Sequence, residues 1–310
     1  MGDEVVLLGD VTPSLAELIE AGPERWLAIR EGTAAQPRVP LADCQPLLPV
    51  APRDYVDFYA SLEHATNVGR LFRPDQPLEP NWRHLPVAYH GRAASVIVSG
   101  SAVARPSGQL GQGRFGATQA LDFECELGFV CGPSTDLGEP VPVESARERI
   151  FGVVLLNDWS ARDIQAWEYR PLGPFLGKSF ATSISPWIVP LDLLPAAGAR
   201  AQDPAPLPYL QDPNPTALDL NIEVAINGEV VTRTNAQNLY WTLPQMLAHA
   251  TVNGAPLGAG DLFGTGTISG PERGSEGCML ELFGGERWLA DGDEVVLSCP
   301  ELGDCRGRVG

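Results

Sequence analysis

The chain has 310 residues, of which 44% are hydrophobic and 19% are charged, and this balance predicts a globular protein with a sizeable core. Its formal net charge of −18 at pH 7 makes nucleic acids and anionic membrane surfaces poor partners. No apolar run reaches the roughly 18 residues of a spanning helix, and the acidic start lacks the basic region of a secretory signal, so we expect a cytoplasmic protein.

The first fifty residues differ in character from the rest of the chain. We expect a short strand over Val5–Leu8 and a helix after Thr12-Pro13-Ser14, because serine is a frequent N-cap. The proline-rich stretch Gln36–Pro52 is typical of a linker. Residues 53–310 are therefore interpreted as the main domain.

The main domain has many short apolar segments separated by turn residues. Asn227-Gly228 lies between β-rich flanks, which is a strong hairpin signal, and Thr242 with Gln245 forms a capping-box pattern. We expect helices over Ser61–Phe72, Ser160–Tyr169 (with Ser160 as N-cap) and Thr242–Thr251, and strands within Val87–Val103, Leu121–Val130, Ile150–Leu156, Leu218–Thr232, Met279–Phe283 and Glu294–Cys299. The pattern predicts a mixed, mainly β fold.

Four carboxylates stand in unusual places. Glu124 and Glu126 share one face of a predicted strand, although a solvent-facing pair is the commoner situation. Asp158 follows the apolar strand Ile150–Leu156, where a simple turn is the alternative, and Asp57 lies among aromatic residues, where a capping role is the alternative. An all-oxygen set of this kind suits a hard cation such as Ca²⁺ or Mg²⁺.

The segment after Asp158 has the features of a binding surface. Arg162, Gln165 and Tyr169 fall on one stripe of the predicted helix, although a solvated helix face would show the same pattern. Lys178 follows shortly and is the only lysine among 21 basic residues. An ammonium group is a compact charge whose pKa burial can shift, so Lys178 is a candidate for a role that arginine cannot fill, with drift as the alternative.

Glu281 and the cysteines complete the observations. In a strand, Glu281 would share its face with Met279 and Phe283, and a carboxylate in that position needs a partner. His64, seven residues after Asp57, is the best placed of the four histidines. None of the six cysteines forms a CxxC pair or stands at zinc spacing from histidines, which favours reduced thiols.

These residues lie in segments that resemble the fumarylacetoacetate hydrolase family, in particular its fumarylacetoacetases. The resemblance runs from about Arg53 to the C-terminus. Its motifs are DYVDFYASLEHATNVGRLFRP, NWRHLPVAYHGRAASVIVSG, LDFECELGFV, LNDWSARDIQAWEYRPLGPFLGKSF and GTGTISGPE followed by MLELF. The resemblance implies a β-sandwich roll and a homodimer. It also implies that residues 1–50 are a shortened SH3-like segment with a linker and that 51–310 are the catalytic domain.

Carried over residue by residue, the resemblance implies a role for each candidate. His64 matches the general base, and Glu281 matches the acid that orients it. Arg162, Gln165 and Lys178 match the groups that stabilise an oxyanion. Asp57, Glu124, Glu126 and Asp158 match the ligands of a divalent cation, Ca²⁺ in the family, and Lys178 and Thr182 match positions associated, together with Asp158, with a nearby Mg²⁺. The implied substrate contacts are Tyr59, Arg73, Tyr89, Gln165, Tyr169 and Thr267.

The implied activity is hydrolysis of a carbon–carbon bond in a dianionic β-diketo acid. The expected reaction converts 4-fumarylacetoacetate and water to fumarate and acetoacetate, as in tyrosine and phenylalanine breakdown. An acylpyruvate hydrolase or a β-keto-acid decarboxylase on the same fold is the enzymatic alternative. A non-catalytic dimer that binds small diacids is the alternative from another class.

Overall fold

The computed structural model describes residues 4–9, 11–12, 14–33 and 36–310, and its centre is an eight-stranded sheet. The strands follow the order β4-β3-β19-β10-β11-β13-β5, with β14 beside β11. Their bounds are β3 Tyr55–Phe58, β4 Ala88–His90, β5 Val96–Val98, β10 Cys125–Cys131, β11 Ile150–Asp158, β13 Thr182–Ile184, β14 Val189–Pro190 and β19 Leu262–Gly264. Every residue of β10 and β11 is buried, so both faces of the sheet centre are covered, as the apolar run from Ile150 predicts.

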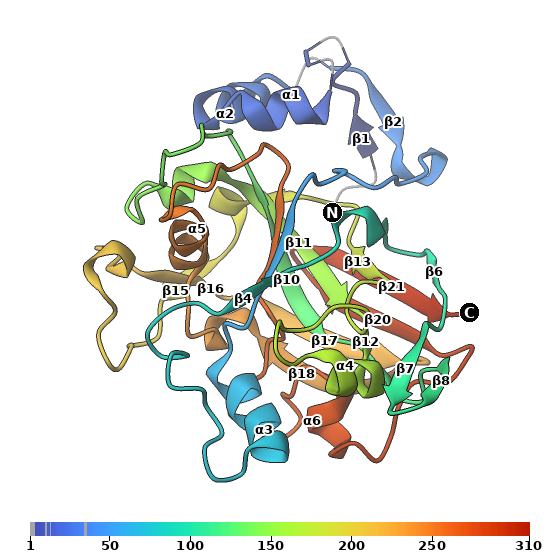
Figure 1. The fold of residues 1–310 in the computed structure, drawn as a ribbon. Coiled ribbons are helices and arrows are strands. Elements are labelled where there is room, and N and C mark those ends of the chain that lie inside the picture. Colours follow the sequence, from blue (N-terminus) through green and yellow to red (C-terminus); the bar gives the residue numbers. More distant parts are fainter. Residues whose placement is uncertain (1–3, 10, 13, 34–35) are drawn as a thin grey trace.

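A five-stranded sheet in the order β18-β17-β20-β21-β6 packs against the first (Figure 1). Its strands are β6 Ala102–Val103, β17 Asn221–Ile226, β18 Glu229–Asn235, β20 Glu294–Cys299 and β21 Gly303–Val309. Leu127 and Phe129 of the first sheet share one core cluster with Val224 and Leu297 of the second. The predicted hairpin is present, with Asn227 and Gly228 both at positive φ (52° and 83°). The fold is therefore the expected mainly β roll.

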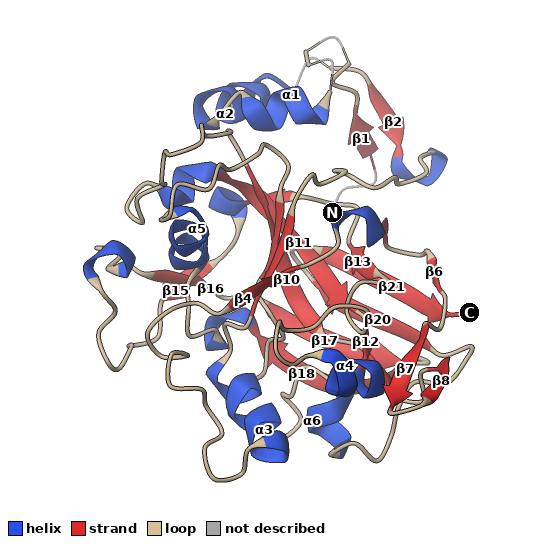
Figure 2. Ribbon diagram, in the orientation of Figure 1, coloured by secondary structure: helices blue, strands red, loops and turns tan. Residues whose placement is uncertain are grey.

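Helices lie around these sheets, and Figure 2 separates them from the strands by colour. Their bounds are α1 Leu15–Glu20, α2 Pro23–Gly32, α3 Leu62–Phe72, α4 Arg162–Glu168, α5 Leu243–Thr251 and α6 Met279–Phe283. The remaining strands form small pairs: β1 Glu4–Val6 with β2 Arg38–Pro40, β7 Ser107–Gly111 with β8 Arg114–Ala117, β9 Leu121–Asp122 with β12 Ser160–Ala161, and β15 Ala196–Gly198 with β16 Thr216–Leu218. In Figure 1, α3, α4 and α6 gather at the end of the molecule opposite α1 and α2.

The N-terminal segment packs onto the main body. Ile19 of α1 is fully buried beside the strand residue Val130, and Glu20 accepts a hydrogen bond from the Ser134 hydroxyl at 2.6 Å. Ser14 caps α1 as expected, while Pro13 lies outside the described residues. The stretch interpreted as a linker contains β2 and is otherwise largely irregular. The SH3-like origin of this segment stays a prediction.

Two sequence-based expectations are wrong. Met279–Phe283 is the helix α6, not a strand, and it ends at Gly284 in the left-handed conformation. Five residues span little more than one helical turn, so an apolar pattern of this length fits either period. Ser160 is not a helix N-cap: it belongs to β12, and its hydroxyl donates to the Asp158 carbonyl, because pairing with β9 keeps the chain extended up to Ala161.

The other elements agree with expectation in type, although Leu121–Val130 is divided into β9 and β10 and Glu124 lies between the two. Ser61 caps α3, and Thr242 and Gln245 form the complete capping box of α5. All six cysteines are free thiols. No helix within the described ranges is long and apolar enough to cross a membrane.

Candidate functional site

Asp57, Glu124, Glu126 and Asp158 meet at one place in the eight-stranded sheet. Asp57 lies in β3, Glu126 in β10 and Asp158 at the end of β11, while Glu124 directly precedes β10. All four side chains are buried, and one oxygen of each lies within 4.8 Å of the others. The structure thus brings together the four acids that the sequence singles out.

Two glycines make room for these acids. A Cβ atom at Gly264 of β19 would lie 2.6 Å from Asp57 Oδ1 and 3.0 Å from Glu126 Oε2. Two residues on, the backbone N–H of Gly266 donates to the same two oxygens, at 3.2 Å and 3.0 Å. Gly266 has a φ of +75°, a conformation that side chains disfavour. The oxygens therefore sit in a cradle that only glycine permits.

The charges of the acids oppose one another. Burial raises the pKa of Asp57 well above its usual value, and the negative charge of Asp158 raises it further. Burial, followed by the charges of Asp57 and Glu124, likewise raises the pKa of Glu126. Glu126 Oε1 is buried and has no hydrogen-bond partner among the described residues. A divalent cation fits this set, since it would offset the repulsion and give the unpaired oxygen a partner.

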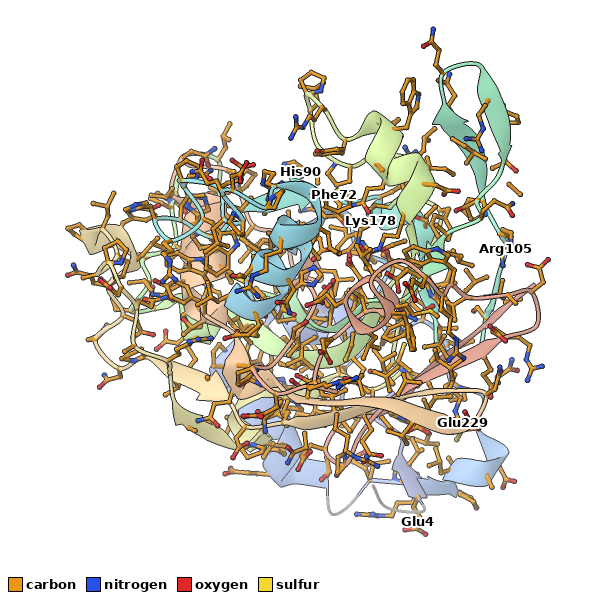
Figure 3. The ribbon with its side chains drawn as sticks, turned by 90° about the horizontal axis from the view of Figure 1, so that it is seen from below. Glu4, Phe72, His90, Arg105, Lys178 and Glu229 are labelled. Atoms are coloured by element: carbon orange, nitrogen blue, oxygen red, sulfur yellow. The ribbon has the colours of Figure 1, made fainter. Side chains whose placement is uncertain are left out.

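Lys178 supplies the positive charge that the acids face directly. Its Nζ donates to Glu124 Oε2 and, at 2.7 Å, to Asp158 Oδ2. Burial disfavours its charge, but Asp158 and Glu124 outweigh burial and raise the pKa of Lys178. The pKa of Glu124 is lowered despite burial, because Lys178 and Arg162 favour its ionised form. Figure 3 shows Lys178 in the middle of the molecule, whereas the labelled Glu4 and Glu229 lie near its rim.

Hydroxyl groups complete the surroundings of Asp158. Tyr89 of β4 donates from its hydroxyl toward Asp158 Oδ2 (2.6 Å) and Asp57 Oδ2 (2.9 Å). Thr182 of β13 donates to Asp158 Oδ1 at 3.1 Å. Burial and the charges of Asp158 and Asp57 raise the pKa of Tyr89, so its phenol stays neutral.

Arg162, the first residue of α4, connects several parts of the site. Its Nε donates to Asp122 Oδ2 at 2.8 Å, and its Nη1 donates to Gln165 Oε1 at 3.2 Å. Its Nη2 lies 2.8 Å from Glu124 Oε1 but lacks hydrogen-bond geometry to any acceptor in the described chain. Arg162 is thus held between two buried carboxylates, those of Asp122 and Glu124.

His64 and Glu281 form a buried pair. His64 Nδ1 lies 2.5 Å from Glu281 Oε2, although α3 and α6 are far apart in the sequence. Asn67 donates to Glu281 Oε1 at 3.0 Å, and Ser269 donates to Oε2 at 2.8 Å. Burial works against the charge of Glu281, but His64 and these two donors lower its pKa below the usual value. The pair leaves His64 Nε2 as the nitrogen that can take a proton from another group.

The remaining candidates divide into two groups. The Tyr59 ring meets the His64 ring edge-on at a centroid distance of 5.1 Å. Thr267 Oγ1 is buried, and no residue in the described part of the chain forms a hydrogen bond with it. In contrast, Arg73 lies at the far end of α3, where it donates to the Pro77 carbonyl and is paired with Glu79. Tyr169 ends α4 beside Arg170. In the described ranges, neither Arg73 nor Tyr169 makes a hydrogen bond or ion pair with the buried acids or with the His64–Glu281 pair.

Sequence reasoning missed four neighbours of these groups. Asn67 and Ser269 hold Glu281, Cys278 places its thiol 3.3 Å from Glu281 Oε2, and Asp122 holds Arg162. Asp122 also accepts hydrogen bonds from the backbone N–H groups of Met279 and Leu280 (2.7 Å and 3.1 Å). Asp122 alternates with Glu124 and Glu126 in the LDFECE motif, and this spacing could have marked it as a site residue. No local sequence pattern marks Asn67, Ser269 or Cys278.

Comparison with known proteins gives one consistent result. Residues 54–310 match the model of the family described as fumarylacetoacetate (FAA) hydrolase C-terminal. The chain is 52% identical over 286 residues to a fumarylacetoacetase of Bos taurus, an alignment covering 84% of this chain and 67% of that protein. It is 51% identical over 296 residues to a fumarylacetoacetase of Caenorhabditis elegans, covering 84% of this chain and 71% of that protein.

Solved structures agree on the fold. A fumarylacetoacetate hydrolase from Exiguobacterium antarcticum superposes with a TM-score of 0.68 at 22% identity, covering 100% of this chain and 92% of the other. A maleylpyruvate hydrolase from Sphingobium sp. SYK-6 superposes with a TM-score of 0.64 at 19% identity, covering 100% and 93%. At these identities the likeness concerns the architecture alone.

Proposed function

Because the chain belongs to the fumarylacetoacetate hydrolase family, we propose that it hydrolyses 4-fumarylacetoacetate to fumarate and acetoacetate. The proposal rests on its relatives of about half-identical sequence, which are named for this activity. The single structural observation that carries it is the buried His64–Glu281 pair, which lies near a cluster of four acids with a lysine. A general base and a site for oxygen anions are the two requirements for hydrolysing a β-diketone.

In this proposal His64 activates water. Nδ1 of the ring is engaged by Glu281, so Nε2 accepts a proton from water as the oxygen attacks the carbonyl carbon. Glu281 then stabilises the imidazolium, because its depressed pKa keeps it ionised inside the protein. The proton returns from His64 to the carbon of the departing acetoacetate unit as the carbon–carbon bond breaks. Such general base catalysis contributes roughly 10²–10⁴ in rate.

The tetrahedral oxyanion needs hydrogen-bond donors. Arg162 donates to Gln165 and is paired with Glu124, to which Lys178 also donates, so the three residues lie in one network. We assign these three residues to oxyanion stabilisation. Loss of one donor at such a site typically costs about 10²–10³ in rate. Lys178 has a second task, since its single positive charge offsets part of the negative charge of Glu124 and Asp158.

The acid cluster is proposed to hold a divalent cation, Ca²⁺ or Mg²⁺. Asp57, Glu124, Glu126 and Asp158 would be its ligands, and Thr182 and Lys178 would lie beside Asp158. When bound, the cation supplies positive charge that polarises carbonyl oxygens and favours an enolate. The glycine cradle and the unpaired Glu126 Oε1 support this assignment.

We further propose that the substrate contacts Tyr59, Tyr89, Gln165 and Thr267. Thr267 Oγ1 lacks a partner, and the Tyr59 ring borders His64, so both can meet a ligand at the reacting centre. Arg73 and Tyr169 would need to move to reach it, since Arg73 is paired with Glu79. From its likeness to the family, we also propose that the protein is a cytoplasmic homodimer. We propose that it consists of an N-terminal segment, residues 1–50, and a catalytic domain, residues 51–310.

The decisive experiment is a spectrophotometric assay with fumarylacetoacetate and, in parallel, with acylpyruvates. Turnover of fumarylacetoacetate to fumarate and acetoacetate supports the proposal. Preferential hydrolysis of acylpyruvates, or release of CO₂ from a β-keto acid, would assign the site to the corresponding enzyme. Binding of a diacid without any turnover would contradict catalysis altogether.

A further inference from the structure

Cys278 places a thiol beside the His64–Glu281 pair. It is the residue that precedes α6, and its Sγ lies 3.3 Å from Glu281 Oε2, the same oxygen that faces His64 Nδ1. One ligand atom of each of the three residues lies within 4.8 Å of the other two. The thiol is fully buried, and the His64 and Glu281 side chains are 4% and 0% exposed. The three side chains therefore form one compact set of potential metal ligands.

The donor types match one class of metal ion. Thiolate sulfur, imidazole nitrogen and carboxylate oxygen are the ligands of zinc, which accepts three protein ligands and leaves a fourth position open. With bond lengths of about 2.3 Å to sulfur and 2.0–2.1 Å to nitrogen and oxygen, tetrahedral geometry separates sulfur and oxygen by about 3.6 Å and nitrogen and oxygen by about 3.3 Å. The 3.3 Å between Sγ and Oε2 is close to this requirement. The 2.5 Å between Nδ1 and Oε2 would widen when an ion replaces the shared proton.

The neighbouring acid cluster favours a different class of metal ion. Its four carboxylates offer only oxygen, the donor that Ca²⁺ and Mg²⁺ prefer. The two sites are adjacent, since Glu124 and Cys278 pair through their backbones. A hard ion can thus bind the acid cluster while a softer ion binds His64, Cys278 and Glu281 next to it. The two sites differ in their ligand atoms, so the bound ions can be distinguished.

We propose that His64, Cys278 and Glu281 form an inhibitory binding site for zinc or a similarly soft divalent cation. Binding releases the Cys278 thiol proton to solvent, while the proton on His64 Nδ1 moves to Nε2, so the imidazole stays neutral and Nε2 can no longer accept a proton from water. No electron is transferred, so the site is reversible and a chelator restores the pair. Metal binding itself does not depend on the proposed function, although inhibition does.

The test uses the full chain and Co²⁺ as an optical probe. With Mg²⁺ in excess to fill the acid cluster, one equivalent of Co²⁺ should give a thiolate-to-cobalt charge-transfer band and the intense visible bands of tetrahedral cobalt. The bands should also appear in Cys44→Ser, which removes a thiol outside the site. They should be lost in Cys278→Ser and should fade from the wild type as Zn²⁺ displaces cobalt. Absence of the charge-transfer band in the wild type, or its persistence in Cys278→Ser, overturns the proposal.

Activity gives an independent measurement. Zn²⁺ should inhibit wild-type and Cys44→Ser turnover despite excess Mg²⁺, and Cys278→Ser should need at least about tenfold more zinc, the effect of a 1.4 kcal/mol loss in binding. Equal zinc sensitivity in Cys278→Ser would place the inhibitory ion at the acid cluster instead and overturn the proposal. If Cys278→Ser does not fold, Cys278→Ala is the second variant. If the protein has no hydrolase activity, the proposed function fails while the cobalt spectra still decide the metal site.

Discussion

Arg162 Nε donates to Asp122 Oδ2 over 2.8 Å, and both side chains are largely buried, with exposed fractions of 9% and 0%. The same carboxylate accepts the first two backbone N–H groups of α6, the helix that carries Glu281. Asp122 thus fixes the orientation of Arg162 and the position of α6 together. Neither role is visible in the sequence. The segments that hold Asp122, Arg162 and α6 are brought together only by β9–β12 pairing and by the loop before α6.

We predict that Asp122→Asn lowers kcat much more than it raises KM. An amide can accept from Met279 or Leu280, but its NH₂ group would face the Arg162 Nε donor, so the guanidinium loses its alignment. Breaking a buried ion pair costs about 3–5 kcal/mol of stability. The measurements are steady-state kinetics and denaturant unfolding, with Asp291→Asn as control, because the Asp291 side chain is 71% exposed at its ion pair with Arg105. Unchanged kcat in a folded Asp122→Asn protein would show that Asp122 has only a structural role.

We predict that activity and thermal stability depend on a divalent cation. An ion that binds only the native state stabilises it, by about 2.7 kcal/mol when its concentration is a hundred times Kd. Exhaustive chelation should therefore lower Tm and abolish turnover, and added Mg²⁺ or Ca²⁺ should restore both. Equal melting curves and equal rates after chelation would contradict the assignment of the acid cluster.

Gly264→Ala provides a test of the same site that leaves every ligand in place. The added Cβ would lie 2.6 Å from Asp57 Oδ1 and 3.0 Å from Glu126 Oε2, so the oxygens must shift. We expect a loss of cation affinity of at least about tenfold, the equivalent of 1.4 kcal/mol, measured by calorimetric titration. The matched control is Gly198→Ala in β15, where an added Cβ meets no atom within 4 Å. Equal cation affinity in the two variants would argue that the cradle does not shape a metal site.

Lys178→Arg should be severely impaired although the charge is kept. The Nζ atom contacts Glu124 and Asp158 in a buried space shaped for a single ammonium group, and a guanidinium is larger and forked. We expect kcat/KM to fall by at least about 10², as for loss of an oxyanion donor. Arg306→Lys, at an exposed ion pair with Asp304, is the control for arginine–lysine exchange. Near-normal kinetics in Lys178→Arg would mean that only the positive charge matters.

His64 and Glu281 should act as one unit. His64→Ala and Glu281→Gln should each lower kcat greatly, and the double mutant should be little worse than the poorer single mutant, because residues that serve one step are strongly non-additive. Cation affinity at the acid cluster should be nearly unchanged in all three, since neither residue belongs to that cluster. Multiplying losses, or loss of Mg²⁺ or Ca²⁺ binding in Glu281→Gln, would separate the two residues.

The sequence by itself determined the strongly patterned parts of the fold. The apolar run from Ile150 predicts a strand buried on both faces, Asn227-Gly228 predicts a hairpin, and Thr242 with Gln245 predicts a capped helix. These features depend on local backbone preference and on periodicity, which neighbouring residues alone can specify. The candidate acids and Lys178 were also identified from their residue types and context.

Tertiary structure decided the rest. Met279–Phe283 became a helix because Asp122, more than 150 residues earlier, accepts its first N–H groups and Gly284 ends it. The conclusion that Glu281 needs a partner agreed with the structure, although the strand on which it was based does not exist. Asn67, Ser269 and Cys278 reach Glu281 from separate segments, and no local pattern encodes such long-range contacts. Spacing along the chain also gave no sign of a histidine–cysteine site, since its three ligands approach one another only when α3 and α6 pack together.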